Sequence, residues 1–188
     1  MQQTSEKWFN AKKAAQVAVF FVNKEGKKMN ALKLVKLIYL ANREHMRQRG
    51  YPIFNDKLVS MKFGPVNSLA YDYIKGKLKS DDWKEFIGER QKHYVVARDA
   101  FKEEDLLELS KAEIQSMEKV WQEFGQETKW DLSDWTHEKC PEWEDPRGGS
   151  VPIPYERVLQ CLGVADPHRC AENIREDRRI AEFFAGES

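Results

Sequence analysis

LKLVKLIYLANR, the stretch from Leu32 to Arg43, is apolar enough to lie at the centre of a protein, yet it carries Lys33, Lys36 and Arg43. Asn30 precedes it as a plausible helix N-cap and Gly50 follows as a plausible C-terminal residue, so we expect one helix over 31–49. At 100° per residue its apolar side chains cover a broad face, which predicts a helix buried in the core.

The cations of this helix are not scattered around its axis but share the remaining arc. They form one basic stripe: Lys33, Lys36, Arg43 and Arg47. Leu40 falls inside the stripe on the same count. The stripe is either the edge of a buried helix, whose Lys and Arg reach solvent, or a partner-binding surface on which an exposed Leu40 is the apolar anchor.

Helix signals recur along the rest of the chain. Small apolar residues repeat with helical spacing over 10–23, and Ser110 and Glu113 form a capping box before another helix. Short helices are expected over 131–139 and 155–163, and Asp166-Pro167 opens a last helix that reaches about Phe184. The expected fold is mainly helical α+β, with about five to six helices around a buried central helix and a small antiparallel sheet.

Two segments have the character of strands, namely Leu58–Lys62 and His93–Arg98. We expect the second to pair with the first around Val59. Gly64 then permits a sharp turn, and Pro65 suits the first position of the next helix, because its missing N–H would be unpaired there anyway.

Charge is unevenly distributed although the formal net charge is zero. Residues 1–80 contain 16 Lys and Arg against 5 Asp and Glu, a balance of +11, and residues 81–188 carry −11. Either the two halves pack together and complement each other, or the first half presents a basic face to an acidic partner. Charge alone does not separate these interpretations.

Several classes of protein find little support in the sequence. It has no apolar run of about 18 residues and no signal-peptide core, which predicts a cytoplasmic protein without a membrane partner. Cys140, Cys161 and Cys170 are expected to be free thiols. His137 and Cys140 show HxxC spacing but lack further zinc ligands or an orienting group. We therefore expect no catalytic residues, no metal, no cofactor and no enzyme activity.

An ordered set of short motifs resembles the Panacea domain, typified by SocA-like antitoxins of bacteria and prophages. The motifs span most of the chain: KLVKLIYLA (33–41), YPIFND (51–56), FGPV (63–66), LSKAE (109–113), LSDWTHEKCPEW (132–143) and IPYE (153–156). No single motif is diagnostic, but their order is fairly specific. The resemblance suggests a Panacea-like domain over 1–165 and a C-terminal helical extension over 166–188, either packed on it or appended.

The resemblance implies an antitoxin that neutralises a cognate protein toxin by direct binding, with a protease or chaperone as an additional partner if it also acts as a proteolytic adaptor. The candidate partner-binding residues are Lys33, Lys36, Leu40, Arg43, Arg47 and His137. Structural roles are expected for Tyr39, Gly64, Pro65 and Trp143, with the Tyr39 ring in the core and its hydroxyl bound to a partner.

A second interpretation stays open, that of a DNA-binding or phage-encoded regulator. Arg43, Arg47 and Arg49 lie towards one helix end, and Lys27 and Lys28 precede the helix. Helix-turn-helix spacing is not convincing and the C-terminal half is acidic, so nucleic acid is the less expected partner.

Overall fold

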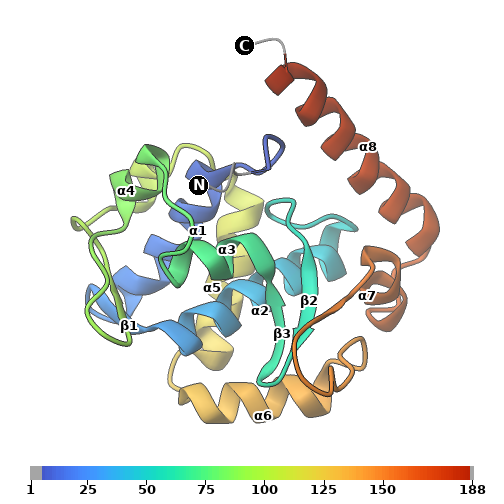
Figure 1. The fold of residues 1–188 in the computed structure, drawn as a ribbon, viewed down its shortest axis with the longest axis horizontal. Helices are drawn as coiled ribbons and strands as arrows, with labels where there is room; N and C mark the ends of the chain where they lie inside the picture. The colour runs from blue at the N-terminus through green and yellow to red at the C-terminus, as the bar shows by residue number, and fades with distance from the viewer. Residues whose placement is uncertain (1–5, 187–188) are drawn as a thin grey trace.

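The computed structural model describes residues 6–186, which form eight α-helices, one 3₁₀ turn and two small antiparallel sheets (Figure 1). The helices are α1 (Ala11–Lys24), α2 (Ala31–Arg49), α3 (Ser68–Ile74), α4 (Asp81–Phe86), α5 (Lys111–Phe124), α6 (Lys129–Lys139), α7 (Tyr155–Cys161) and α8 (Pro167–Gly186). The strands are β1 (Lys28–Asn30), β2 (Leu58–Met61), β3 (Gly64–Asn67), β4 (Tyr94–Val96) and β5 (Val151–Pro152). The 3₁₀ turn covers Glu103–Asp105.

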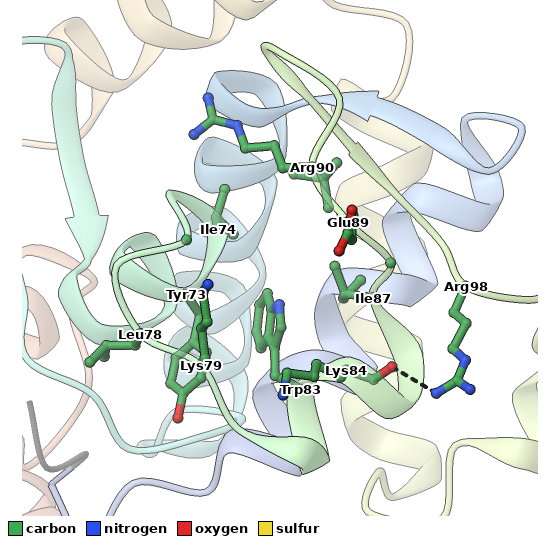
Figure 2. A pocket seen from close by; sticks show the side chains of 13 residues that line it. Tyr73, Ile74, Leu78, Lys79, Trp83, Lys84, Ile87, Glu89, Arg90 and Arg98 are labelled. Atoms are coloured by element: carbon green, nitrogen blue, oxygen red, sulfur yellow. Dashed lines mark hydrogen bonds between the residues drawn. The ribbon is translucent and has the colours of Figure 1, made fainter. Parts of the chain in front are cut away.

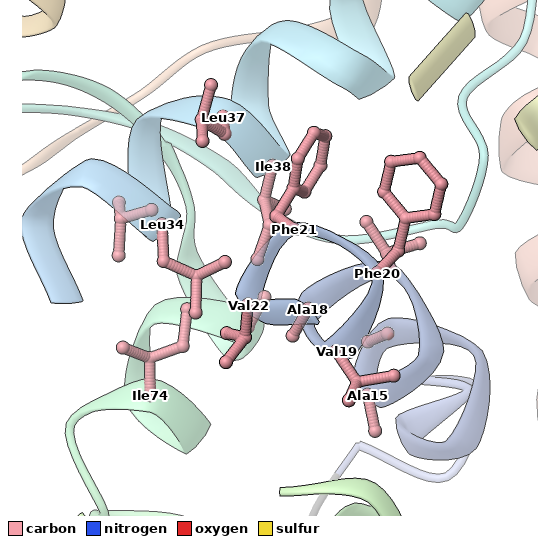
Figure 3. Close-up of a cluster of buried hydrophobic side chains, with 14 of the residues drawn as sticks. Ala15, Ala18, Val19, Phe20, Phe21, Val22, Leu34, Leu37, Ile38 and Ile74 are labelled. Carbon is pink, nitrogen blue, oxygen red and sulfur yellow. The ribbon is translucent and has the colours of Figure 1, made fainter. Parts of the chain in front are cut away.

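The core is built where α1 packs against α2, as Figure 3 shows for Phe21, Val22 and Leu34. Asn10 caps α1 by accepting from the Lys13 N–H at 2.8 Å, so that helix begins as the sequence predicts. The small side chains of α1 allow close approach, and three of its alanines are fully covered: Ala14, Ala15 and Ala18. Helix α2 also contacts α3, α5, α6, α7 and strands of both sheets.

The predicted bounds of α2 are confirmed at both ends. The Asn30 side chain accepts from the Leu32 N–H at 3.0 Å, and Gly50 ends the helix in the left-handed conformation with φ of 80°. The capping box of Ser110 and Glu113 is confirmed at the start of α5. Local capping chemistry therefore sets these helix ends.

The predicted strand pairing is wrong. Strand β4 pairs with β1, with Val95 opposite Met29, whereas β2 pairs with β3 and β5. Strand β1 has three residues, two of them polar, so it carries no strand pattern in the sequence. Its partner could not be chosen from periodicity alone.

The predicted role of Pro65 is also wrong. Pro65 lies in β3, opposite Ser60, and the helix begins only at Ser68. Strand β3 is at the edge of its sheet, where a missing N–H breaks no ladder hydrogen bond. Buried Asp56 instead caps the helix, accepting from the N–H groups of Leu69 at 2.9 Å and Ala70 at 3.0 Å.

The described residues contain more helices than the five or six expected. Helix α4 has only six residues and Ser80 as its cap, too short to show a helical period. Helix α8 packs on α7 and lies along one side of the molecule (Figure 1). It is held near its middle by Arg178, which donates to Asn55 at 2.8 Å and lies over the Trp8 ring. Residues 1–5 and 187–188 of the two expected domains lie outside the described residues.

The two oppositely charged halves do pack together. Four cations of the first 80 residues form ion pairs with carboxylates of the second half: Lys12–Glu85, Lys13–Glu113, Lys24–Glu118 and Arg43–Glu142. Part of the positive charge is therefore neutralised within the chain. Within residues 6–186, no helix has the length and apolar character needed to cross a membrane.

Candidate partner-binding site at the hairpin junction

Three segments far apart in the sequence meet where α2, the β2–β3 hairpin and the segment from α6 to Trp143 come together (Figure 1). We call this place the hairpin junction and define it by five residues: Lys36, Tyr39, Gly64, Thr136 and Glu142. Three of the motifs that carry the family resemblance contribute these residues: KLVKLIYLA, FGPV and LSDWTHEKCPEW. Its polar side chains are buried and are bound mainly to groups within the chain.

Lys36 is fully buried and its ammonium donates one hydrogen bond to the carbonyl of Pro65 at 3.0 Å. Among residues 6–186 no carboxylate lies within 4.0 Å of Lys36 Nζ. Burial lowers the pKa of Lys36 to about 7, because the apolar surroundings disfavour the charged form. The side chain thus holds the edge strand β3 onto α2 through a backbone carbonyl rather than through an ion pair.

Gly64 is required for this contact. Its φ is +102°, and a Cβ there would lie 2.7 Å from Lys36 Nζ and 2.5 Å from Thr136 Oγ1. Any side chain would therefore collide with α2 and α6 together and be strained in its backbone. The glycine does more than permit a turn, because it lets three elements approach one another.

Glu142 is the acceptor on the other side of the junction. Its carboxylate is fully buried and accepts from the Tyr39 hydroxyl at 2.8 Å and from Arg43 Nε at 2.7 Å. Burial raises the pKa of Tyr39, and the neighbouring Glu142 carboxylate raises it further, so this hydroxyl remains a donor. The expectation that the Tyr39 ring lies in the core with its hydroxyl bound to a partner is confirmed.

His137 and Cys140 do not form a nucleophile pair. Burial raises the pKa of Cys140 to about 12, so the thiol stays protonated at neutral pH. The His137 ring instead packs 4.3 Å from the Trp143 ring, whose indole N–H donates to the Met61 carbonyl at 3.0 Å. These two residues attach the segment after α6 to the hairpin. Within residues 6–186, no three His, Cys, Asp or Glu side chains gather as a metal site would require.

The expected open edge of α2 is covered. Leu40 is only 3% exposed, so its predicted role as an exposed anchor is wrong. Lys33 is also buried, and donates to Glu25 at 2.8 Å and to the Gly125 carbonyl at 2.8 Å. Helices α5 and α6 pack over this arc. The basic stripe is therefore largely an interior lining, and Arg47, paired with Glu44, is the member that reaches the surface.

An exposed pair of aromatic rings lies on the outside of the junction. Phe63, at the hairpin tip, is 44% exposed and Trp130, at the start of α6, is 52% exposed, with ring centroids 5.7 Å apart. The ammonium groups of Lys62 and Lys129 lie 5.5 and 5.0 Å from these rings. We call these four residues the aromatic patch.

The patch is held in place from the interior. The Ser133 hydroxyl donates to the Phe63 carbonyl at 3.0 Å, which ties the hairpin tip to α6. Sequence reasoning missed Trp130 because an exposed aromatic has no periodic signal, and Phe63 stands out in the sequence only as part of the FGPV motif. The structure alone brings the two rings together.

Comparison with protein families gives one match in this region. The model described as "Antitoxin SocA-like, Panacea domain" matches residues 34–144, which is more than half of the chain. No curated protein and no solved structure matches. The matched segment includes the hairpin junction and the aromatic patch, whereas α1, α7 and α8 lie outside it.

Proposed function

The chain belongs to the SocA-like antitoxin family with the Panacea domain, and on this premise we propose that it neutralises a cognate protein toxin by direct binding. The aromatic patch of Phe63 and Trp130 is the proposed docking surface. The protein acts in this proposal as a binding partner rather than as an enzyme.

The observation that carries the proposal is the exposure of two aromatic rings in edge-to-face contact, on a hairpin tip that is hydrogen-bonded to α6. Trp and other aromatics are enriched among the residues that contribute most to protein–protein affinity. Phe63 and Trp130 belong to separate elements, yet Ser133 and the hairpin junction hold them together. A surface that is already ordered loses little conformational entropy on binding, which favours affinity.

The charge and apolar character of the patch indicate which kind of toxin surface is complementary to it. Lys62 and Lys129 flank the rings, so a complementary toxin surface offers an apolar pocket for Trp130 and carboxylates at its rim. Lys33, Lys36 and Leu40 are buried, so in this proposal they do not contact the toxin. Lys36 acts through the position of the hairpin, which it binds at the Pro65 carbonyl.

The experiment compares two matched double variants in cells that also express the neighbouring gene product as the toxin. The test variant is Trp130→Ala with Lys129→Gln. The control is Tyr94→Ala with Lys28→Gln, because Tyr94 is 43% exposed and has the Lys28 ammonium 4.8 Å from its ring. We expect the test variant to lose rescue and to bind the purified toxin about 30-fold more weakly, while the control behaves as wild type.

Equal rescue by both folded variants removes the aromatic patch from the proposal. A neighbour that is harmless alone, or equally toxic with and without this chain, removes the antitoxin function for that pair. Toxin abundance measured in the same cells separates occlusion, in which toxin accumulates, from delivery to a protease or chaperone, in which it disappears.

Salt dependence distinguishes this function from the DNA-binding alternative. Binding dominated by apolar anchors changes little with moderate salt, whereas binding to phosphates weakens steeply because counterions are released. The ion pairs between the two halves already occupy part of the basic surface that such binding would use.

A further inference from the structure

A cavity lies between the end of α3, α4 and the segment that leads into β4 (Figure 2). These elements lie away from α6 and the hairpin tip, which carry the aromatic patch (Figure 1). The volume of the cavity is about 560 Å³, which is within the range of sites that bind small molecules. Buried apolar side chains line it, among them Ile74, Leu78, Trp83, Ile87 and Val95.

Four cations surround this apolar floor. Lys79, Lys84, Arg90 and Arg98 line the cavity together with a single carboxylate, Glu89. We call this site the basic-rimmed pocket. In the described part of the chain, no carboxylate lies within 4.0 Å of a side-chain nitrogen of Lys79, Arg90 or Arg98. The positive charge at this pocket is thus only partly neutralised by the protein.

Two polar atoms of lining residues also lack partners. Arg90 Nε and the Tyr73 hydroxyl are buried and make no hydrogen bond within the described residues. Arg90 makes one contact elsewhere, at 3.5 Å to the Lys75 carbonyl, and Arg98 donates to the Lys84 carbonyl at 3.2 Å (Figure 2). Buried polar groups normally find a partner, so these two residues offer donors that the described part of the chain does not itself use.

We propose that the basic-rimmed pocket binds a small organic anion, with an apolar or aromatic body on the floor and a phosphate or carboxylate group at the cationic rim. Trp83 stacks on Tyr73 with centroids 5.0 Å apart, so two packed aromatic rings form part of the floor. Arginine and lysine at the edge supply charge-assisted donors to the anionic group. This inference does not depend on the toxin-binding proposal, because the pocket lies away from α6 and the hairpin tip.

Calorimetry with the dye 8-anilinonaphthalene-1-sulfonate, an aromatic anion, tests the pocket directly in the full chain. The test variant is Lys79→Gln with Arg98→Gln, both of which are exposed and leave the floor intact. The control is Lys111→Gln with Arg169→Gln, which removes the same charge at exposed positions outside the pocket. We expect one saturable site in the wild type and the control, and about tenfold weaker binding in the test variant.

Competition identifies the class of anion. AMP offers an aromatic body with a phosphate, decanoate offers an aliphatic body with a carboxylate, and inorganic phosphate and acetate offer the anion alone. Displacement of the dye by AMP or decanoate, but not by the bare anions, supports the proposal and selects the class. Equal dye binding by both double variants, absence of a saturable site, or no displacement by either competitor overturns it.

Discussion

The hairpin junction and the basic-rimmed pocket both place cations beside apolar surface, but with opposite outcomes. At the junction, Lys36 is buried and donates to the Pro65 carbonyl, and beside it the partly buried Arg43 donates to Glu142. At the pocket, Lys79 and Arg98 are exposed and have no carboxylate partner among the described residues. A cation that is buried and satisfied contributes to the fold, whereas one left at the edge of a cavity is available to a ligand.

Glu142→Ala gives the largest expected effect on this comparison. It leaves the Tyr39 hydroxyl and the Arg43 guanidinium without their buried acceptor, which costs about 3–5 kcal/mol in the free energy of unfolding. Glu144→Ala is the control, because its side chain is 49% exposed and pairs with Arg157 at the surface. Urea unfolding monitored by circular dichroism measures both, and a loss below about 1 kcal/mol for both variants contradicts the structural role of the junction.

Gly64→Ala is expected to cost about 2–4 kcal/mol, because the added Cβ collides with Lys36 and Thr136 and the backbone is strained at φ +102°. Gly148→Ala is matched to it, with φ of +96° but open space around the Cβ. It therefore shows the cost of the left-handed backbone alone. Equal losses of unfolding free energy in the two variants mean that the close approach of the three elements is unimportant.

Stability should rise with pH above about 7 because of Lys36. Its pKa is about 7 in the folded chain and higher in the unfolded chain, so between these values the unfolded chain holds more protons. The free energy of unfolding rises by at most about 1.4 kcal/mol per pH unit from this one group. Lys36→Met should remove this rise, whereas Lys111→Met at an exposed position should keep it. Urea unfolding between pH 7 and 9 measures how the free energy of unfolding changes with pH. If this slope is the same in Lys36→Met as in the wild type, the buried Lys36 is not the cause of the rise.

Arg98→Gln tests the other side of the comparison and has the smallest expected effect. Arg98 is exposed, and within residues 6–186 its side chain donates one hydrogen bond, to the Lys84 carbonyl. We expect the free energy of unfolding to stay within about 0.5 kcal/mol of the wild type. A loss as large as that of Glu142→Ala would show that the rim of the pocket is structural too.

Local signals predicted the main helices well. The caps of α1, α2 and α5 and the left-handed Gly50 involve neighbouring residues, so the sequence contains all that is needed to place them. The same local reasoning failed for Pro65, because whether a proline begins a helix or lies in a strand depends on whether its strand has a free edge.

The candidate site was only partly predictable. The structural roles predicted for Tyr39 and Gly64 place both in the hairpin junction, and Trp143 binds the hairpin beside it. The basic stripe, predicted at an open edge, is mostly covered. The covering residues come from far along the chain, for example Glu142 for Arg43 and the Gly125 carbonyl for Lys33. The exposed ring of Trp130 had no signal in the sequence at all.

By itself, the sequence determined the longer helical segments, where several of them begin and end, and which family the motifs resemble, because capping and periodicity act over a few residues. The tertiary structure decided which faces are covered and which charges stay unpaired. It did so because those outcomes depend on contacts between residues that are distant in the chain. Both the sequence and the structure place the stretch Leu32–Arg43 of α2 in the core. The surfaces proposed for binding can be identified only in the folded structure.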